Sequence, residues 1–234
     1  MKILEAIDLR KAYGALQVTN DVNFSVDAGE VLGIIGPNGA GKSTAFGLIA
    51  GAIPTDAGSV WLDGRDVTRL GAASRCRAGI GRTYQIPRPF GGLTVYENVL
   101  LAAQAGGGDP NAVPDVLRRL GLAALAGQRA GTLRLLDRKR LEMARAMATA
   151  PQVLLLDEVA GGLTEPECAV LIETVRELRG DGLGIVWIEH VVGALLAVAD
   201  RLLVLDQGRV LAEGEPQATF HAPEVRSVYM GIAA

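Results

Sequence analysis

Hydrophobic and polar residues alternate over short distances in the N-terminal part of this chain, a pattern typical of β-strands. Two glycine-containing pairs, Ala28-Gly29 and Asp63-Gly64, interrupt the pattern as predicted turns. The expected strands are residues 3–9, 22–26, 31–35 and 59–62. We therefore expect an antiparallel β layer beside one strand, 31–35, that is apolar throughout.

The spacing becomes helical at about residue 94 and returns to strand–helix alternation after residue 150. Thr94 and Glu97 are placed to form a capping box that begins a helix, and the glycine run 106–108 ends it. A second helix is expected over 113–120. The elements expected after it are strands at 153–156, 184–188 and 201–205, helices at 165–179 and 191–199, and a short helical cap from residue 214. This alternation predicts a parallel sheet with crossover helices, so the fold class is α/β.

Composition places the chain among ordinary globular proteins. Its 234 residues suffice for one large α/β domain, and 49% of them are hydrophobic and 21% charged. The net charge is -3 and no long basic block is present, so no nucleic acid is expected as a partner. The apolar runs are far shorter than the roughly 18 residues of a membrane span, and the N-terminus lacks a signal peptide's apolar segment. The expected location is the cytoplasm, and any role at a membrane would depend on a partner protein.

Residues 36–44 carry the clearest chemical signal in the chain. They match the phosphate-loop pattern G-x-x-x-x-G-K-[ST], with an apolar strand before the loop and a helix-prone run after it. The glycines let several N–H groups converge on one anion, Lys42 can reach the outer phosphates, and the Ser43 hydroxyl is placed for Mg²⁺. An accidental glycine-rich turn is the alternative, and the strand–loop–helix setting disfavours it. The residues expected to bind the phosphates of a nucleotide are Gly36, Asn38, Gly39, Ala40, Gly41, Lys42, Ser43 and Thr44.

Two carboxylates, Asp157 and Glu158, directly follow the apolar run 153–156. A buried parallel strand ending in acids suits the edge of an α/β sheet where ligands bind. Asp157 is expected to hold Mg²⁺ through water, and Glu158 to orient and deprotonate an attacking water. An exposed acidic turn is the alternative, and the phosphate loop upstream favours the functional interpretation.

Three further residues are weaker candidates, and each has a plain structural alternative. Gln85 follows another predicted strand and could ligate Mg²⁺ or the lytic water, although a solvated polar residue is the common case. His190 ends the apolar stretch 185–188 and could contact a γ-phosphate or hold the general base, or be a structural histidine. Tyr13 could stack on adenine or be a core tyrosine.

These residues, in this order and over nearly the whole chain, resemble the nucleotide-binding subunits of ABC transporters. The resemblance identifies 36–44 with the Walker A motif, 154–158 with Walker B and its catalytic glutamate, Gln85 with the Q-loop, His190 with the H-loop and Tyr13 with the adenine-stacking aromatic. It implies that Glu158, His190, Lys42 and Gln85 are catalytic, that ATP and Mg²⁺ are the cofactors, and that Ser43, Gln85 and Asp157 are the metal ligands. The implied fold is a P-loop NTPase with a RecA-like core and β layer from 1–93 and 151–234, and a helical subdomain over 94–150 that carries the signature region.

Residues 82–99 resemble more narrowly the ATPases of branched-chain amino-acid importers and their relatives for amides and urea, and residues 188–190, 199–201 and 212–214 agree. An ATP-hydrolysing subunit of a membrane importer is then expected, bound peripherally at the cytoplasmic face of the inner membrane. The implied partners are a second ATPase subunit in a head-to-tail dimer, usually a different chain, two membrane permease subunits and, indirectly, a periplasmic solute-binding protein.

Three departures from the family pattern qualify this expectation. The signature Leu-Ser-Gly-Gly-Gln is replaced by Leu-Arg-Leu-Leu-Asp over 133–137, so the serine and the close-approach glycine are absent. Arg134 or Arg138 could supply charge to the partner's phosphate instead. Val159 replaces a proline, and Gly-Gly-Leu-Thr over 161–164 replaces the usual D-loop ending.

The altered signature leaves several interpretations open. One site of the dimer would hydrolyse ATP with this chain's Walker motifs, while the site that uses its signature would be slow or structural. Full function at both sites is the alternative. Two other hypotheses are a regulatory subunit that binds ATP with weak turnover and a nucleotide-binding module that acts without a transporter.

Overall fold

The computed structural model describes residues 1–230, so the last four positions of the expected domain, 231–234, lie outside the described residues. A four-stranded antiparallel sheet forms the first layer, in the order β2-β1-β4-β5. Its strands are β1 (Lys2–Tyr13), β2 (Leu16–Asp27), β4 (Ala57–Leu62) and β5 (Arg65–Asp66). This confirms the expected β layer. β1 and β2 extend beyond the predicted bounds because their backbones stay paired up to the hairpin turn, from Lys2 opposite Asp27 to Tyr13 opposite Leu16.

The second sheet has six strands in the order β10-β9-β3-β8-β7-β6. They are β3 (Val31–Ile35), β6 (Ile80–Arg82), β7 (Val153–Asp157), β8 (Gly184–Ile188), β9 (Arg201–Asp206) and β10 (Arg209–Gly214). The first five are parallel, as predicted, and β10 pairs antiparallel with β9. β10 was not expected; Gln207 and Gly208, both with positive φ, form the tight turn that folds it back along β9.

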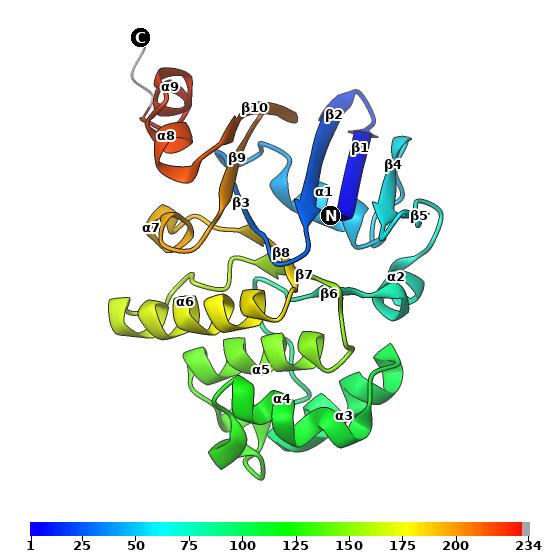
Figure 1. The fold of residues 1–234 in the computed structure, drawn as a ribbon, viewed down its shortest axis with the longest axis vertical. Coiled ribbons are helices and arrows are strands. Elements are labelled where there is room, and N and C mark those ends of the chain that lie inside the picture. Colours follow the sequence, from blue (N-terminus) through cyan, green and yellow to red (C-terminus); the bar gives the residue numbers. More distant parts are fainter. Residues whose placement is uncertain (231–234) are drawn as a thin grey trace.

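Helices cover the six-stranded sheet, and three of them form a separate group at one end of the molecule (Figure 1). That group is α3 (Val95–Gly106), α4 (Val113–Arg119) and α5 (Leu135–Met147), with 3₁₀ turns at Pro110–Ala112, Ala123–Leu125 and Ala130–Thr132. The capping box of Thr94 and Glu97 begins α3, as predicted. The other helices are α1 (Lys42–Ile49), α2 (Ala72–Ala78), α6 (Glu165–Gly180), α7 (Val192–Leu196), α8 (Pro216–His221) and α9 (Pro223–Met230). The helix expected over 191–199 is shorter than predicted, and α2 was not predicted.

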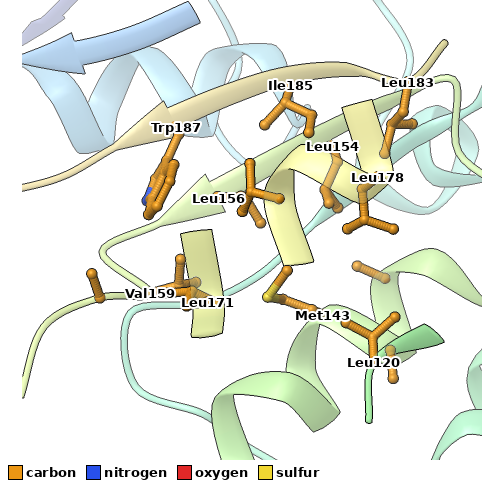
Figure 2. Close-up of a cluster of buried hydrophobic side chains, with 14 of the residues drawn as sticks. Leu120, Met143, Leu154, Leu156, Val159, Leu171, Leu178, Leu183, Ile185 and Trp187 are labelled. Atoms are coloured by element: carbon orange, nitrogen blue, oxygen red, sulfur yellow. The ribbon is translucent and has the colours of Figure 1, made fainter. Parts of the chain in front are cut away.

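One hydrophobic core lies on each face of the six-stranded sheet, because successive residues of a strand point to opposite sides. On one face, Leu156 and Trp187 pack with Leu171 of α6 and Met143 of α5 (Figure 2). On the other face, Leu155 and neighbouring strand residues pack against α1 and the β layer. Val159, which stands where the family has proline, is buried in the first core (Figure 2). Because β3, β8, β7 and β6 are parallel neighbours, the loops that follow them meet at one edge of the sheet.

Candidate functional site

The phosphate loop connects β3 to α1, and glycine is sterically required at both of its ends. A Cβ atom on Gly36 would lie 2.2 Å from the Leu205 carbonyl oxygen, and one on Gly41 would lie 2.5 Å from the Val18 carbonyl oxygen. Gly41 is also the N-cap of α1, with φ of 100°. The loop therefore packs against neighbouring backbone on its outer side and directs the start of α1 toward the site, where helix N–H groups can bind an anion.

Lys42 is buried and folded back onto this loop. Its ammonium donates to the carbonyl oxygens of Gly36 at 2.7 Å and of Pro37 at 3.0 Å. Burial lowers the pKa of Lys42, and the nearby carboxylates of Glu158 and Asp157 partly oppose this shift. The ammonium thus lies at the base of the loop. Its acceptors are two neutral carbonyl oxygens, which an anionic phosphate can replace because charged acceptors form stronger hydrogen bonds.

Glu158 connects the ends of three neighbouring strands. Its carboxylate lies 2.8 Å from Nε2 of His190, which follows β8, and accepts a hydrogen bond from the amide of Gln85, which follows β6. Its backbone has a positive φ of 48°, and its carbonyl oxygen accepts from the buried Lys139 of α5 at 3.1 Å. Three residues predicted separately from the sequence are therefore in direct contact, around a carboxylate whose backbone is fixed by α5.

A cavity of about 180 Å³ lies between the phosphate loop and the Glu158–His190 pair. The residues that line it are Val18, Asn38, Gly39, Ala40, Gly41, Lys42, Ser43, Thr44, Glu158 and His190. Val18 was not among the predicted residues. Tyr13 does not line this cavity; it is half-exposed at the end of β1, with the Lys11 ammonium 5.7 Å from its ring centre. The alternative prediction, that Tyr13 is a core residue, is therefore wrong. Its stacking on adenine stays a prediction.

Asp157 ends β7 and forms an ion pair that was not predicted. Its Oδ2 lies 3.0 Å from Nη2 of Arg82 on the neighbouring strand β6, and its backbone N–H donates to the Thr83 hydroxyl at 3.1 Å. The Arg82 guanidinium in turn lies over the Tyr84 ring, 5.1 Å from its centre. In the sequence, Arg82 was noted only as part of a family-like segment. Its place at the end of a predicted strand was the signal that could have marked it as a site residue.

Glu189, also missed, links the loops after β7 and β8. Its buried carboxylate accepts from the Ala160 N–H at 2.5 Å, from the Trp187 indole at 3.2 Å and from the His190 N–H at 3.2 Å. Burial raises its pKa, while these hydrogen bonds act in the opposite direction. Glu189 therefore fixes the backbone on which His190 is presented.

The altered signature lies at the start of α5, before which Arg134 is the N-cap. Arg138 is occupied, since its guanidinium donates to the carbonyl oxygens of Leu133 at 2.8 Å and Gly131 at 3.2 Å. Arg134 is exposed, and within residues 1–230 its side chain makes no recorded hydrogen bond. Of the two arginines that could supply charge to a partner, Arg134 is the available one.

The sequence profile of the ABC transporter family matches residues 19–161. The chain belongs to the ABC transporter family. Two similar curated proteins are lipopolysaccharide export system ATP-binding proteins LptB. The one from Acidithiobacillus ferridurans is 35% identical, covering 98% of this chain and 97% of its own, and the one from Escherichia coli K12 is 33% identical, covering 99% and 98%.

Solved structures agree with this assignment. A nucleotide-free ATP-binding cassette from an ABC transporter has a TM-score of 0.92 and 29% identity, and covers 100% of both chains. A cassette in its ADP conformation has a TM-score of 0.91 and 30% identity, and covers 99% of this chain and 100% of its own. The predicted ABC ATPase fold is confirmed: this is an ATP-binding, ATP-hydrolysing subunit that powers a membrane transporter and works with a partner ATPase and membrane components.

The narrower resemblance to amino-acid importers is not supported by these relatives. Both curated proteins are named for lipopolysaccharide export, and neither for amino-acid transport. The importer prediction came from residues 82–99. A segment near the nucleotide site indicates that the protein is an ATPase of this type, but it says less about which substrate is transported. No helix within residues 1–230 is long and apolar enough to cross a membrane.

Proposed function

We propose that Glu158 is the general base that takes a proton from the water attacking the γ-phosphate of ATP. One observation carries this proposal: the Glu158 carboxylate lies in the same cavity as the phosphate loop and is oriented by both His190 and Gln85. A carboxylate held in this way positions water and accepts its proton with little reorganisation. Lys42 supplies the positive charge that offsets the charge developing on the phosphoryl oxygens.

The residues present suit magnesium as well as the nucleotide. A hydroxyl, an amide oxygen and a carboxylate, from Ser43, Gln85 and Asp157, are the oxygen donors that Mg²⁺ prefers. When bound, the ion would neutralise charge on the β- and γ-phosphates. Gln85 and Asp157 each have a protein partner, Glu158 and Arg82, that restrains the side chain.

A second ATPase subunit would complete each site in a head-to-tail dimer. The start of α5, with Arg134 exposed at its N-cap, is the part of this chain offered to the partner's nucleotide. A guanidinium there can replace the hydrogen bonds that a serine and glycine would give, at the cost of a longer approach. A different chain as the partner fits the altered signature better than a second copy.

Coupling to the membrane subunits would use the apolar groove between α2, α3 and α5. This groove has a volume of about 290 Å³, and Tyr84 lies both in its wall and in the segment that follows β6. Ile86 and Phe90, farther along that segment, are exposed large hydrophobic residues. Gln85 joins this segment to Glu158, so a permease helix seated in the groove would contact the segment that holds the general base. Two such permease subunits would hold the ATPases at the cytoplasmic face of the membrane.

Two classes of molecule are candidates for the transported substrate. The names of the curated relatives favour a lipopolysaccharide-type lipid and export. Residues 82–99 favour a branched-chain amino acid or a related small polar solute, with a periplasmic binding protein delivering it. The complete complex with its membrane subunits distinguishes them. It would be purified from the native membrane and reconstituted in proteoliposomes, and its ATPase activity measured. Activity would rise with lipopolysaccharide if the first candidate is the substrate, and with a leucine-loaded binding protein if the second is.

Single-turnover hydrolysis by that complex tests the proposed function itself. Hydrolysis that depends on Glu158 and Mg²⁺ supports a motor. Retained ATP that is not hydrolysed would instead favour the regulatory subunit that the altered signature leaves open.

A further inference from the structure

The last helix of the chain reaches the first residue of the phosphate loop. The hydroxyl of Tyr229, on α9, accepts a hydrogen bond from the Gly36 N–H at 2.8 Å. The carbonyl oxygen of the same glycine accepts from the Lys42 ammonium at 2.7 Å. Gly36 thus joins α9 to the loop lysine through its two peptide groups, although Tyr229 is 193 residues away in sequence.

The Gly36 N–H has little freedom to find another partner. Gly36 is buried, and a Cβ atom added to it would lie 2.2 Å from the Leu205 carbonyl oxygen and 3.1 Å from the Ala40 Cβ atom. A buried backbone donor that loses its acceptor pays most of its desolvation cost, so the peptide would turn or the loop would shift to recover a bond. Either response changes the position of the carbonyl oxygen that holds Lys42.

Packing of α9 places the hydroxyl at this point. Val225, one helical turn before Tyr229, is fully buried in the core. The Tyr229 ring packs against the same core and meets the Phe220 ring edge-on, with 6.3 Å between ring centres. Burial raises the pKa of the Tyr229 hydroxyl, so it stays protonated and neutral at physiological pH. The position of the hydroxyl is therefore fixed by the packing of α9, and its hydrogen bond to the loop forms only when α9 is packed in this way.

We propose that Tyr229 is a positioning residue that holds the first peptide of the phosphate loop in the conformation that receives the phosphates. Docking of α9 then sets the affinity of this chain for nucleotide. The contact belongs to the ground state of the loop and does not touch the attacking water, so KM for ATP changes while kcat does not.

The test uses the full chain with Tyr229→Phe, which removes the hydroxyl and keeps the ring. Calorimetry with ADP and Mg²⁺ is expected to show about fivefold weaker binding, the scale of one net hydrogen bond. The Gly36 amide resonance is expected to move and to exchange with solvent faster than in the native chain. Tyr96→Phe is the matched control, because Tyr96 is partly exposed on α3 and its hydroxyl makes no recorded hydrogen bond within residues 1–230.

Unchanged ADP affinity together with an unchanged Gly36 amide would overturn the proposal. Equal weakening by Tyr96→Phe would overturn it too, because the effect would then be unrelated to the loop. Loss of folding in Tyr229→Phe would show that the hydroxyl serves stability and not positioning. In the assembled transporter, a fall in kcat with KM unchanged would contradict the assigned role.

Discussion

Arg82 and Asp157 form an ion pair at the ends of two neighbouring parallel strands, with 3.0 Å between Nη2 and Oδ2. Their side chains are only 16% and 9% exposed, so neither charge is well hydrated. Removing one partner leaves the other charge buried, and we expect Arg82→Met to lower the free energy of unfolding by about 3 kcal/mol, the lower end for a buried pair. Urea unfolding without nucleotide measures this loss.

If Mg²⁺ binds beside Asp157 as proposed, magnesium and ADP should restore part of that stability, because the bound cation replaces the missing charge. The rise in thermal midpoint on adding Mg²⁺ and ADP is then larger for Arg82→Met than for the native protein. Arg77→Met is the control. Arg77 and Arg82 both line the groove between α2, α3 and α5, but Arg77 is exposed. An equal rise in all three proteins would show that the Asp157 charge does not reach the metal.

Replacement of Glu158 by glutamine should remove the proposed general base and leave ATP binding intact. We expect the ATPase rate of the assembled complex to fall about 10²-fold or more, the scale of a lost general base, while ATP still binds. The amide also keeps an acceptor for Gln85. Steady-state hydrolysis and ATP titration measure the two effects, with Glu177→Gln as the control on the exposed face of α6. Near-full activity in Glu158→Gln would refute the role of Glu158.

Local pattern was enough to predict the elements whose own residues display the signal. β3 and β8 have the predicted bounds because their residues are buried at every position, and the polar residues after β7 and β8 mark where the strands end. The capping box at Thr94 is a contact across three residues, which the sequence displays directly.

Contacts that depend on strand order could not be predicted in the same way. Arg82 meets Asp157 across 75 residues, and Glu189 meets Ala160 across 29, because β6, β7 and β8 are neighbours in the sheet. The sequence gives no direct signal of that order. β10 was missed for a different reason: its burial only alternates between partly buried and exposed, so its apolar signal is weak.

Glu189 should make stability depend on pH. Burial raises its pKa above the ordinary value of 4.5, so the folded state binds this proton more tightly than the unfolded chain does. Stability from this group is full below the ordinary pKa and is lost as pH rises toward the raised folded value. Glu189→Gln has no proton to lose, so its free energy of unfolding relative to the native protein should increase as the pH rises above about 4.5, by about 1.4 kcal/mol for each unit of pKa shift.

Urea unfolding of both proteins at several pH values measures this difference. Glu177→Gln, at an exposed position, should show a difference that does not vary with pH. A stability difference for Glu189→Gln that is constant with rising pH would mean that the four hydrogen bonds to its carboxylate cancel the effect of burial, and one that falls would mean that they outweigh it.

Arg134 provides the sharpest test of the altered signature. If its exposed guanidinium stabilises the γ-phosphate held by the partner subunit, Arg134→Ala should lower hydrolysis at that site by about tenfold or more, as for a charge supplied in trans, measured in a complex whose other site is silenced by Glu158→Gln. Arg134→Lys should recover part of the rate, because a point charge lacks the bidentate geometry of arginine. Arg129→Ala, exposed on the same stretch, is the control. The partner's own Walker lysine can be mutated to isolate the other site; if Arg134→Ala then slows the remaining hydrolysis as strongly, Arg134 acts on assembly and not on the phosphate across the interface.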